Sequence, residues 1–212
     1  MKFTFKSTMV VTTLASAALL GGTVAAHAAG IVAVGGDTTE RDVALEATTD
    51  GIYFDTDYGI EMLCEENAGA GSVAAGAAVP GPGLLSLTPT TSVNCVLPEI
   101  FDLPVTVTYN DTWEFSASGP AVNGVAPGTV SGVEVRVESD LTDFCNFTAA
   151  GDMRAEFDST AQQLRLLAEP LVEYPLAITD AQGCLLFVQD GDVGQFVADY
   201  DVTTDEGAIT FR

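Results

Sequence analysis

Carboxylates are the groups of this chain that could do chemistry, because it holds 30 Asp and Glu residues against 7 Lys and Arg. In the segment DTDYGIE, Asp55, Asp57 and Glu61 place hard oxygen ligands beside a turn, which is what Ca²⁺ requires. Asp190 and Asp192, in the segment DGD, form a second oxygen cluster. Both segments are more typical of acidic surface turns than of Ca²⁺ sites. The sequence therefore offers two candidate Ca²⁺ sites and predicts no other cofactor.

Catalysis by this chain would have to rely on pairs of carboxylates. A glycosidase needs two carboxyl groups about 5 Å or about 6.5–9.5 Å apart across a sugar-binding cleft, a distance that a sequence does not contain. Acidic residues on strand faces are mostly solvated. We therefore predict no catalytic residues and a non-enzymatic protein, with a carboxylate-dependent glycan-active enzyme or a glycan-binding module as the alternative.

The usual nucleophilic devices depend on His or Lys. The only histidine and the only lysines of the chain lie at its start: His27, Lys2 and Lys6. Two lysines, an apolar run over residues 9–20 and the tripeptide AHA before Ala29 are typical of a secretory signal peptide. The apolar run is shorter than the roughly 20 residues that span a bilayer. We expect residues 1–28 to be removed, with no transmembrane anchor, which excludes Ser–His–Asp triads and Cys–His pairs.

The charge of the exported chain limits its partners. After loss of the signal peptide, the chain has five arginines and thirty acidic residues, which gives a formal charge of −25. Such a surface repels phosphate backbones and anionic membranes. We expect no nucleic-acid binding and an extracellular location, free or associated with the cell envelope. Partners would be cationic or neutral surfaces such as glycans, and the sequence predicts no particular oligomeric state.

Four cysteines remain, an even number in an exported chain: Cys64, Cys95, Cys145 and Cys184. An exported chain with widely spaced cysteines and no histidine favours two disulfides over a zinc site. Of the three possible connectivities we expect the sequential one, Cys64–Cys95 and Cys145–Cys184.

Alternation of apolar and polar residues dominates the rest of the chain and predicts antiparallel strands. The strand candidates are VEVRVE, FVADYDV, MRAEF, LPVTVTY, SVNCVL, CLLFV and AITF. Residues 159–168 fit either a helix or the second arm of a hairpin, and we expect strand. Turn signals about every 8–12 residues predict an all-β, antiparallel β-sandwich or barrel-like domain. We place this domain at residues 51–212, after an acidic N-terminal segment at residues 29–50.

The single tryptophan, Trp113, has two interpretations. An exposed tryptophan would suit stacking against a sugar or another ligand. However, Trp113 alternates with Tyr109 and Phe115, and a large aromatic side chain in such a pattern is more often part of a core.

An ordered set of residues runs through the C-terminal three quarters of the chain: Cys64, Cys95, Trp113, Gly128, Gly132, Cys145, Gly151, Gly183, Cys184, Gly191, Asp192, Phe196 and Tyr200. Over roughly residues 59–211 the chain resembles a family of small secreted four-cysteine proteins of actinomycetes. The resemblance implies an all-β secreted domain and assigns no activity. The acidity of this chain departs from the family pattern. We therefore expect a domain that acts at or outside the cell envelope through surface contacts.

Overall fold

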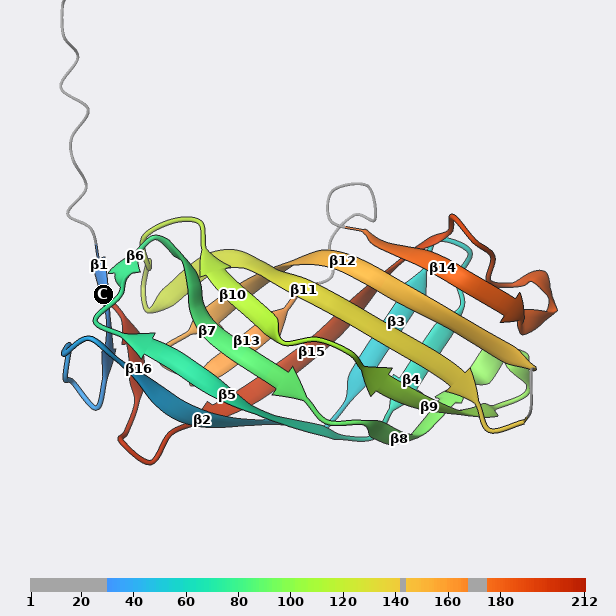
Figure 1. Cartoon of the computed structure of the whole chain (residues 1–212), viewed down its shortest axis with the longest axis horizontal. Helices are drawn as coiled ribbons and strands as arrows, with labels where there is room; N and C mark the ends of the chain where they lie inside the picture. Colours follow the sequence, from blue (N-terminus) through green and yellow to red (C-terminus); the bar gives the residue numbers. More distant parts are fainter. Residues whose placement is uncertain (1–29, 142–143, 168–174) are drawn as a thin grey trace, which may run out of the picture.

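Strands make up nearly all regular structure in the computed structural model, which describes residues 30–141, 144–167 and 175–212 (Figure 1). The predicted signal peptide lies outside these residues. The described residues form sixteen strands and two short 3-10 helices: β1 (Gly30–Val34), β2 (Arg41–Thr49), β3 (Ile52–Thr56), β4 (Glu61–Cys64), β5 (Asn67–Ala75), β6 (Ala78–Val79), β7 (Gly81–Pro89), β8 (Ser92–Leu97), η1 (Pro98–Ile100), β9 (Leu103–Tyr109), β10 (Trp113–Ala117), β11 (Val125–Ser139), β12 (Cys145–Asp158), β13 (Gln163–Leu166), β14 (Leu176–Gly183), η2 (Cys184–Leu186), β15 (Val193–Thr203) and β16 (Ile209–Phe211). The predicted all-β antiparallel class is confirmed.

Thirteen strands form one sheet that closes on itself twice. One ring runs β15–β2–β5–β7–β10–β11–β12–β13 and returns to β15. The second ring runs β15–β3–β4–β8–β9–β11–β12–β14 and also returns to β15. The long strands β11, β12 and β15 belong to both rings, so the two rings follow one another along an elongated molecule (Figure 1).

The core fills the interior of both rings, because strand residues alternate between buried and exposed along each ladder. Buried aromatic side chains follow one another along its length. Phe54 packs on Phe147 and Phe196 with ring centroids 5.8 and 4.7 Å apart. Phe211 packs on Phe115 and Phe157 at 6.0 and 4.9 Å. The contact of Phe54 with Phe147 links β3 to β12 through the core of the second ring, and the contacts of Phe211 link β16 of the small sheet to β10 and β12.

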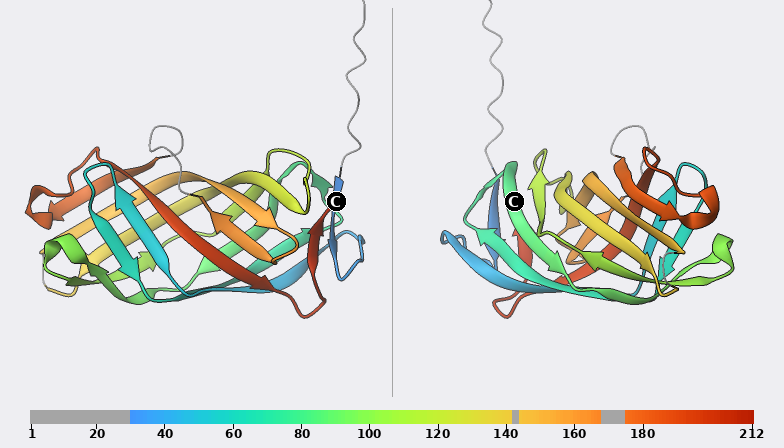
Figure 2. Two further views of the ribbon diagram at one scale, coloured as in Figure 1. Left: turned by 180° about the vertical axis from the view of Figure 1, so that it is seen from behind. Right: turned by 45° about the vertical axis from the view of Figure 1, so that its right-hand side comes forward.

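The two ends of the molecule differ. A small sheet of β16, β1 and β6 lies at one end, together with the C-terminus (Figure 2). The other end is formed by hairpin loops. Residues 30–50 belong to this fold, because β2 pairs with β5 over its whole length and also with β15. The boundary expected near Gly51 therefore falls in the short turn between β2 and β3.

Most of the predicted strands lie where the alternation put them. SVNCVL and LPVTVTY are β8 and β9, and VEVRVE, MRAEF and FVADYDV lie within β11, β12 and β15. Of the ambiguous residues 159–168, Gln163–Leu166 is strand β13. In the part of the chain that the structure describes, no helix is long and apolar enough to cross a membrane.

Both expected disulfides, Cys64–Cys95 and Cys145–Cys184, are present, with Cα–Cα distances of 4.1 and 4.2 Å. Each reinforces a place where a ring is held by few ladder contacts. Cys64–Cys95 joins β4 to β8, which share a single register pair, Leu63 with Val96. Cys145–Cys184 fastens the connection between β14 and β15, which share two register pairs.

Candidate functional site

Four hairpin loops form the end of the molecule opposite the C-terminus and the small sheet. They join β3 to β4, β8 to β9, β11 to β12 and β14 to β15, and these eight strands are the second ring. Because neighbouring strands in the ring are antiparallel, all four loops meet at one end (Figures 1 and 2). We call this surface the loop end.

Direct contacts join the four loops to one another. The Val193 amide donates to Asp57 at 3.4 Å and the Asp57 amide to the Val193 carbonyl at 3.1 Å, which links the β14–β15 and β3–β4 loops. The Glu61 amide donates to the Glu99 carboxylate at 3.1 Å, which links β4 to η1.

The circle of contacts closes on the other side of the ring. The Asp140 amide donates to the Pro104 carbonyl at 3.1 Å. The Cys184 amide donates to the Phe144 carbonyl at 2.8 Å, beside the Cys145–Cys184 disulfide. The loop end is thus a connected surface rather than four separate loops.

Exposed apolar side chains gather on the loop end. Among the described residues eight large hydrophobic side chains are exposed, and six of them lie on these four loops: Tyr58, Phe101, Leu141, Leu185, Leu186 and Phe187. Phe101 and Leu186 are 87% and 78% exposed. Each loop contributes at least one of the six. Large apolar side chains grouped in this way are typical of an interaction surface.

The backbone of two of these loops is held in a conformation that side chains disfavour. Phe101 and Asp102 have φ of 59° and 53°, and Cys184, Leu185 and Leu186 have φ of 51°, 51° and 67°. Left-handed backbone at non-glycine residues costs of order 1–3 kcal/mol each and persists only where surrounding contacts impose it. Here the imposed turns direct Phe101, Leu185 and Leu186 into solvent.

The prediction of a strand at CLLFV is wrong, because the backbone of residues 184–186 is left-handed rather than extended. Residues 184–186 form η2, and the chain then turns into β15. The disulfide and the Phe144 carbonyl fix Cys184, which is fully buried, and the left-handed turn at Leu185 breaks the alternation. Leu185, Leu186 and Phe187 are therefore exposed instead of lying on a strand.

The candidate Ca²⁺ residues lie on the loop end, and several of their carboxylates accept backbone N–H groups. Asp57 accepts from Val193, Asp190 from Ala181 at 2.8 Å and Asp192 from Gln189 at 2.7 Å. These bonds fix turns. In residues 30–141, 144–167 and 175–212, no three His, Cys, Asp or Glu side chains form a group that could hold a metal ion.

Asp55 and Glu61 are directly opposite one another in the β3–β4 ladder, with Glu99 near them. Burial and then the Glu61 carboxylate raise the pKa of Asp55 above its ordinary value of 3.8. Burial, a hydrogen bond to Glu61 and the neighbouring carboxylates raise the pKa of Tyr53 to about 12. The flank of the loop end therefore carries crowded negative charge.

Trp113 is buried, with 1% of its surface exposed, so its position favours the core interpretation over ligand stacking. Its ring contacts Tyr109 and Tyr200 edge-on, at 5.5 and 6.2 Å. A chain of hydrogen bonds runs beside it: Tyr200 Oη donates to Asn67, Asn67 Nδ2 donates to Ser92 Oγ, and Ser92 Oγ shares a bond with Tyr109 Oη. Within the described residues, Trp113 Nε1 has no hydrogen-bond partner.

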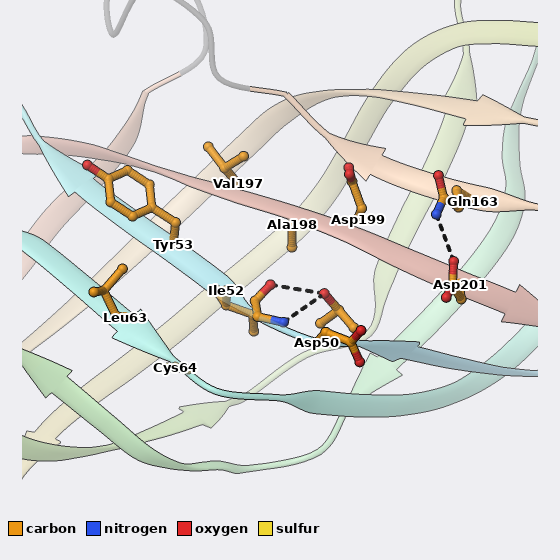
Figure 3. Close-up of a pocket in the computed structure, with 12 residues that line it drawn as sticks. Asp50, Ile52, Tyr53, Leu63, Cys64, Gln163, Val197, Ala198, Asp199 and Asp201 are labelled. Carbon is orange, nitrogen blue, oxygen red and sulfur yellow. Dashed lines mark hydrogen bonds between the residues drawn. The ribbon is translucent and has the colours of Figure 1, made fainter. Parts of the chain in front are cut away.

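A shallow acidic pocket of about 480 Å³ opens where β2 and β3 diverge from β15 (Figure 3). Asp50, Asp199 and Asp201 line one part of it, and Gln163 Nε2 donates to Asp201 at 2.8 Å. Tyr53 is its single aromatic side chain. Sequence reasoning did not single out this pocket or the loop end, because both are created by strands that are distant in the chain.

Comparison of the chain with protein-family models, with curated proteins and with solved structures finds no match.

Proposed function

We propose that this chain is a secreted, non-enzymatic domain that acts at or outside the cell envelope by binding a partner through its loop end. The observation that carries the proposal is the gathering of six of the eight exposed large hydrophobic side chains on the four loops of one end. Exposed apolar groups of this size cost solvation free energy unless a partner covers them, at about 25 cal/mol per Å².

Three further features support this proposal. The contacts among the loops and the Cys145–Cys184 disulfide hold the apolar side chains in place before binding, which lowers the entropy cost of association. The two disulfides suit an oxidising compartment. The predicted signal peptide, with cleavage before Ala29, suits export.

The alternative, a carboxylate-dependent glycan-active enzyme or glycan-binding module, is best represented by the acidic pocket. Sugar sites usually combine aromatic platforms with polar groups. This pocket offers Tyr53 alone, and Trp113, which would have supplied a second platform, is in the core. We therefore favour the loop end over the pocket.

Co-sedimentation with cell-envelope preparations tests the proposal. The variant F101N/L186N replaces two exposed apolar side chains by Asn, which adopts left-handed backbone readily. V122N is the matched control, because Val122 is 64% exposed but lies on the β10–β11 loop at the other end. We expect F101N/L186N to lose at least tenfold in binding and V122N to bind like the wild type.

The pocket variant D199N/D201N separates the two functions. We expect it to bind the envelope preparations like the wild type, and we expect none of the proteins to hydrolyse their glycans. Equal binding by the wild type and F101N/L186N, or glycan hydrolysis that D199N/D201N abolishes, would overturn the proposal.

A further inference from the structure

The charges around the loop end indicate the chemistry of its partner. The loops and the strand ends that carry them contain many acids: Asp55, Asp57, Glu61, Glu99, Asp102, Glu138, Asp140, Asp180, Asp190 and Asp192. In sequence, the four loops themselves contain no Lys or Arg. The nearest basic residue on these strands, Arg136 of β11, is bound to Glu138 at 2.8 Å. The loop end is thus an apolar surface with an unbalanced acidic rim.

We infer that the loop end binds a protein partner whose contact surface carries apolar residues edged by Lys and Arg. This inference rests on the proposed function and adds the class of partner. An interface is most favourable where potentials are complementary, and like charges brought together weaken binding. A cationic rim on the partner would neutralise the carboxylates of the loops and strand ends while its apolar centre covers Phe101 and Leu186.

The same charges disfavour two other occupants. A second copy of this chain would bring two acidic rims face to face. A lipid surface would require exposed carboxylates of the loops and strand ends, such as Asp102 and Asp180, to lose water without gaining a cation. Anionic lipid would add direct repulsion to that cost.

Asp102 and Asp180 allow the rim to be tested without disturbing the loops. Both are exposed and both have left-handed backbone, with φ of 53° and 55°. Asn accepts this backbone, so D102N/D180N removes two charges and keeps the turns. D42N/D205N is the matched control, because it makes the same change in net charge at exposed residues on β2 and in the β15–β16 turn.

The probe is an eighteen-residue amphipathic peptide of Leu and Lys, whose binding to the purified mature protein is measured by titration calorimetry in a salt series. Two control peptides replace every Lys by Glu or every Leu by Ser. We expect both controls to bind at least tenfold more weakly, and we expect F101N/L186N to weaken the Leu/Lys peptide at least tenfold. D102N/D180N should weaken it about threefold or more beyond D42N/D205N and reduce its dependence on salt.

The outcomes separate the inference from the proposed function. Equal losses in D102N/D180N and D42N/D205N, or equal binding of the Leu/Glu peptide, would overturn the cationic partner while leaving the loop end as the contact surface. Stronger binding to phosphatidylcholine vesicles than to the peptide would assign a lipid surface instead. A dimer in sedimentation velocity that F101N/L186N abolishes would assign a second copy. If F101N/L186N binds every probe like the wild type, the proposed function itself fails.

Discussion

Two aspartates of this molecule, one at each end, have opposite electrostatic roles, although they are the same residue type. Asp55 is partly buried and lies opposite Glu61. Its burial and then the Glu61 carboxylate raise its pKa. Asp158 accepts the amides of Ala161 and Thr160 and pairs with Arg165 at 2.9 Å, and these interactions lower its pKa. Ionised Asp55 therefore destabilises the native state, whereas ionised Asp158 stabilises it.

Replacing each aspartate by Asn should move the melting temperature in opposite directions. At neutral pH we expect D55N to raise it and D158N to lower it. The effect of D55N should decrease as pH falls through the raised folded pKa of Asp55 and should be gone below the unfolded value of about 3.8. The Asp158 contribution is present above the unfolded pKa of about 3.8 and is lost as pH falls through the lower folded value. Thermal unfolding from neutral to acidic pH measures both, and shifts of the same sign would contradict this assignment.

The buried hydrogen-bond chain beside Trp113 predicts a specific cost for losing one hydroxyl group. In Y200F the Asn67 Oδ1 atom loses its donor inside the core. An unsatisfied buried acceptor costs about 1–3 kcal/mol in the free energy of unfolding. Y58F, at a tyrosine that is 69% exposed, is the control and should change nothing. Chemical denaturation of both variants measures the difference, and equal stability would show that Asn67 finds another donor.

At the scale of elements, the two disulfides should have similar effects on stability and different effects on the loop end. They close loops of 31 and 39 residues in sequence separation, worth about 3–4 kcal/mol each in the chain-entropy model. Only Cys145–Cys184 fixes the start of η2. We expect both C64A/C95A and C145A/C184A to lower the melting temperature.

Hydrogen exchange distinguishes the two variants. C145A/C184A should increase exchange at the amides around Leu185 to Val188, and C64A/C95A should leave these amides protected. If exchange in this segment is the same in both variants, the contacts with the neighbouring loops suffice to hold η2.

The elements that the sequence predicted are those governed by local pattern. SVNCVL and LPVTVTY became β8 and β9 because one buried face imposes a period of two on the residues. CLLFV failed because its conformation depends on a disulfide to β12 and on a carbonyl of Phe144, neither of which alternation records. The available signal was the run of four apolar residues after Cys184, which is too long for the alternation of a half-buried strand.

At the scale of the whole molecule, the candidate site is a product of topology. The residues of the loop end come from four hairpins spread over residues 57–192, and only closure of the second ring brings them together. The sequence did place Asp57, Asp190 and Asp192 among acidic turns. It did not predict that these turns lie side by side. It also did not predict that Trp113 would be buried in the core and that the exposed apolar side chains would lie on the loops.

The charge of the whole molecule gives the last prediction. Ion pairs join Arg41, Arg136 and Arg165 to five carboxylates, whereas the chain holds thirty acidic residues. Most of the thirty acids therefore repel one another across the folded surface, which opposes compaction. Because the Debye length falls to about 10 Å at 0.1 M salt, we expect the melting temperature to rise with sodium chloride.

A Ca²⁺ site at DTDYGIE or DGD would add a further rise by mass action. Since Asp57, Asp190 and Asp192 already accept backbone amides, we expect Ca²⁺ and Mg²⁺ at matched ionic strength to act alike. Thermal unfolding across the salt series, repeated with each divalent ion, measures both effects. A melting temperature that does not change with sodium chloride would mean that repulsion between the carboxylates is too weak to affect stability. A rise that occurs with Ca²⁺ and not with Mg²⁺ would establish a specific site on the loop end.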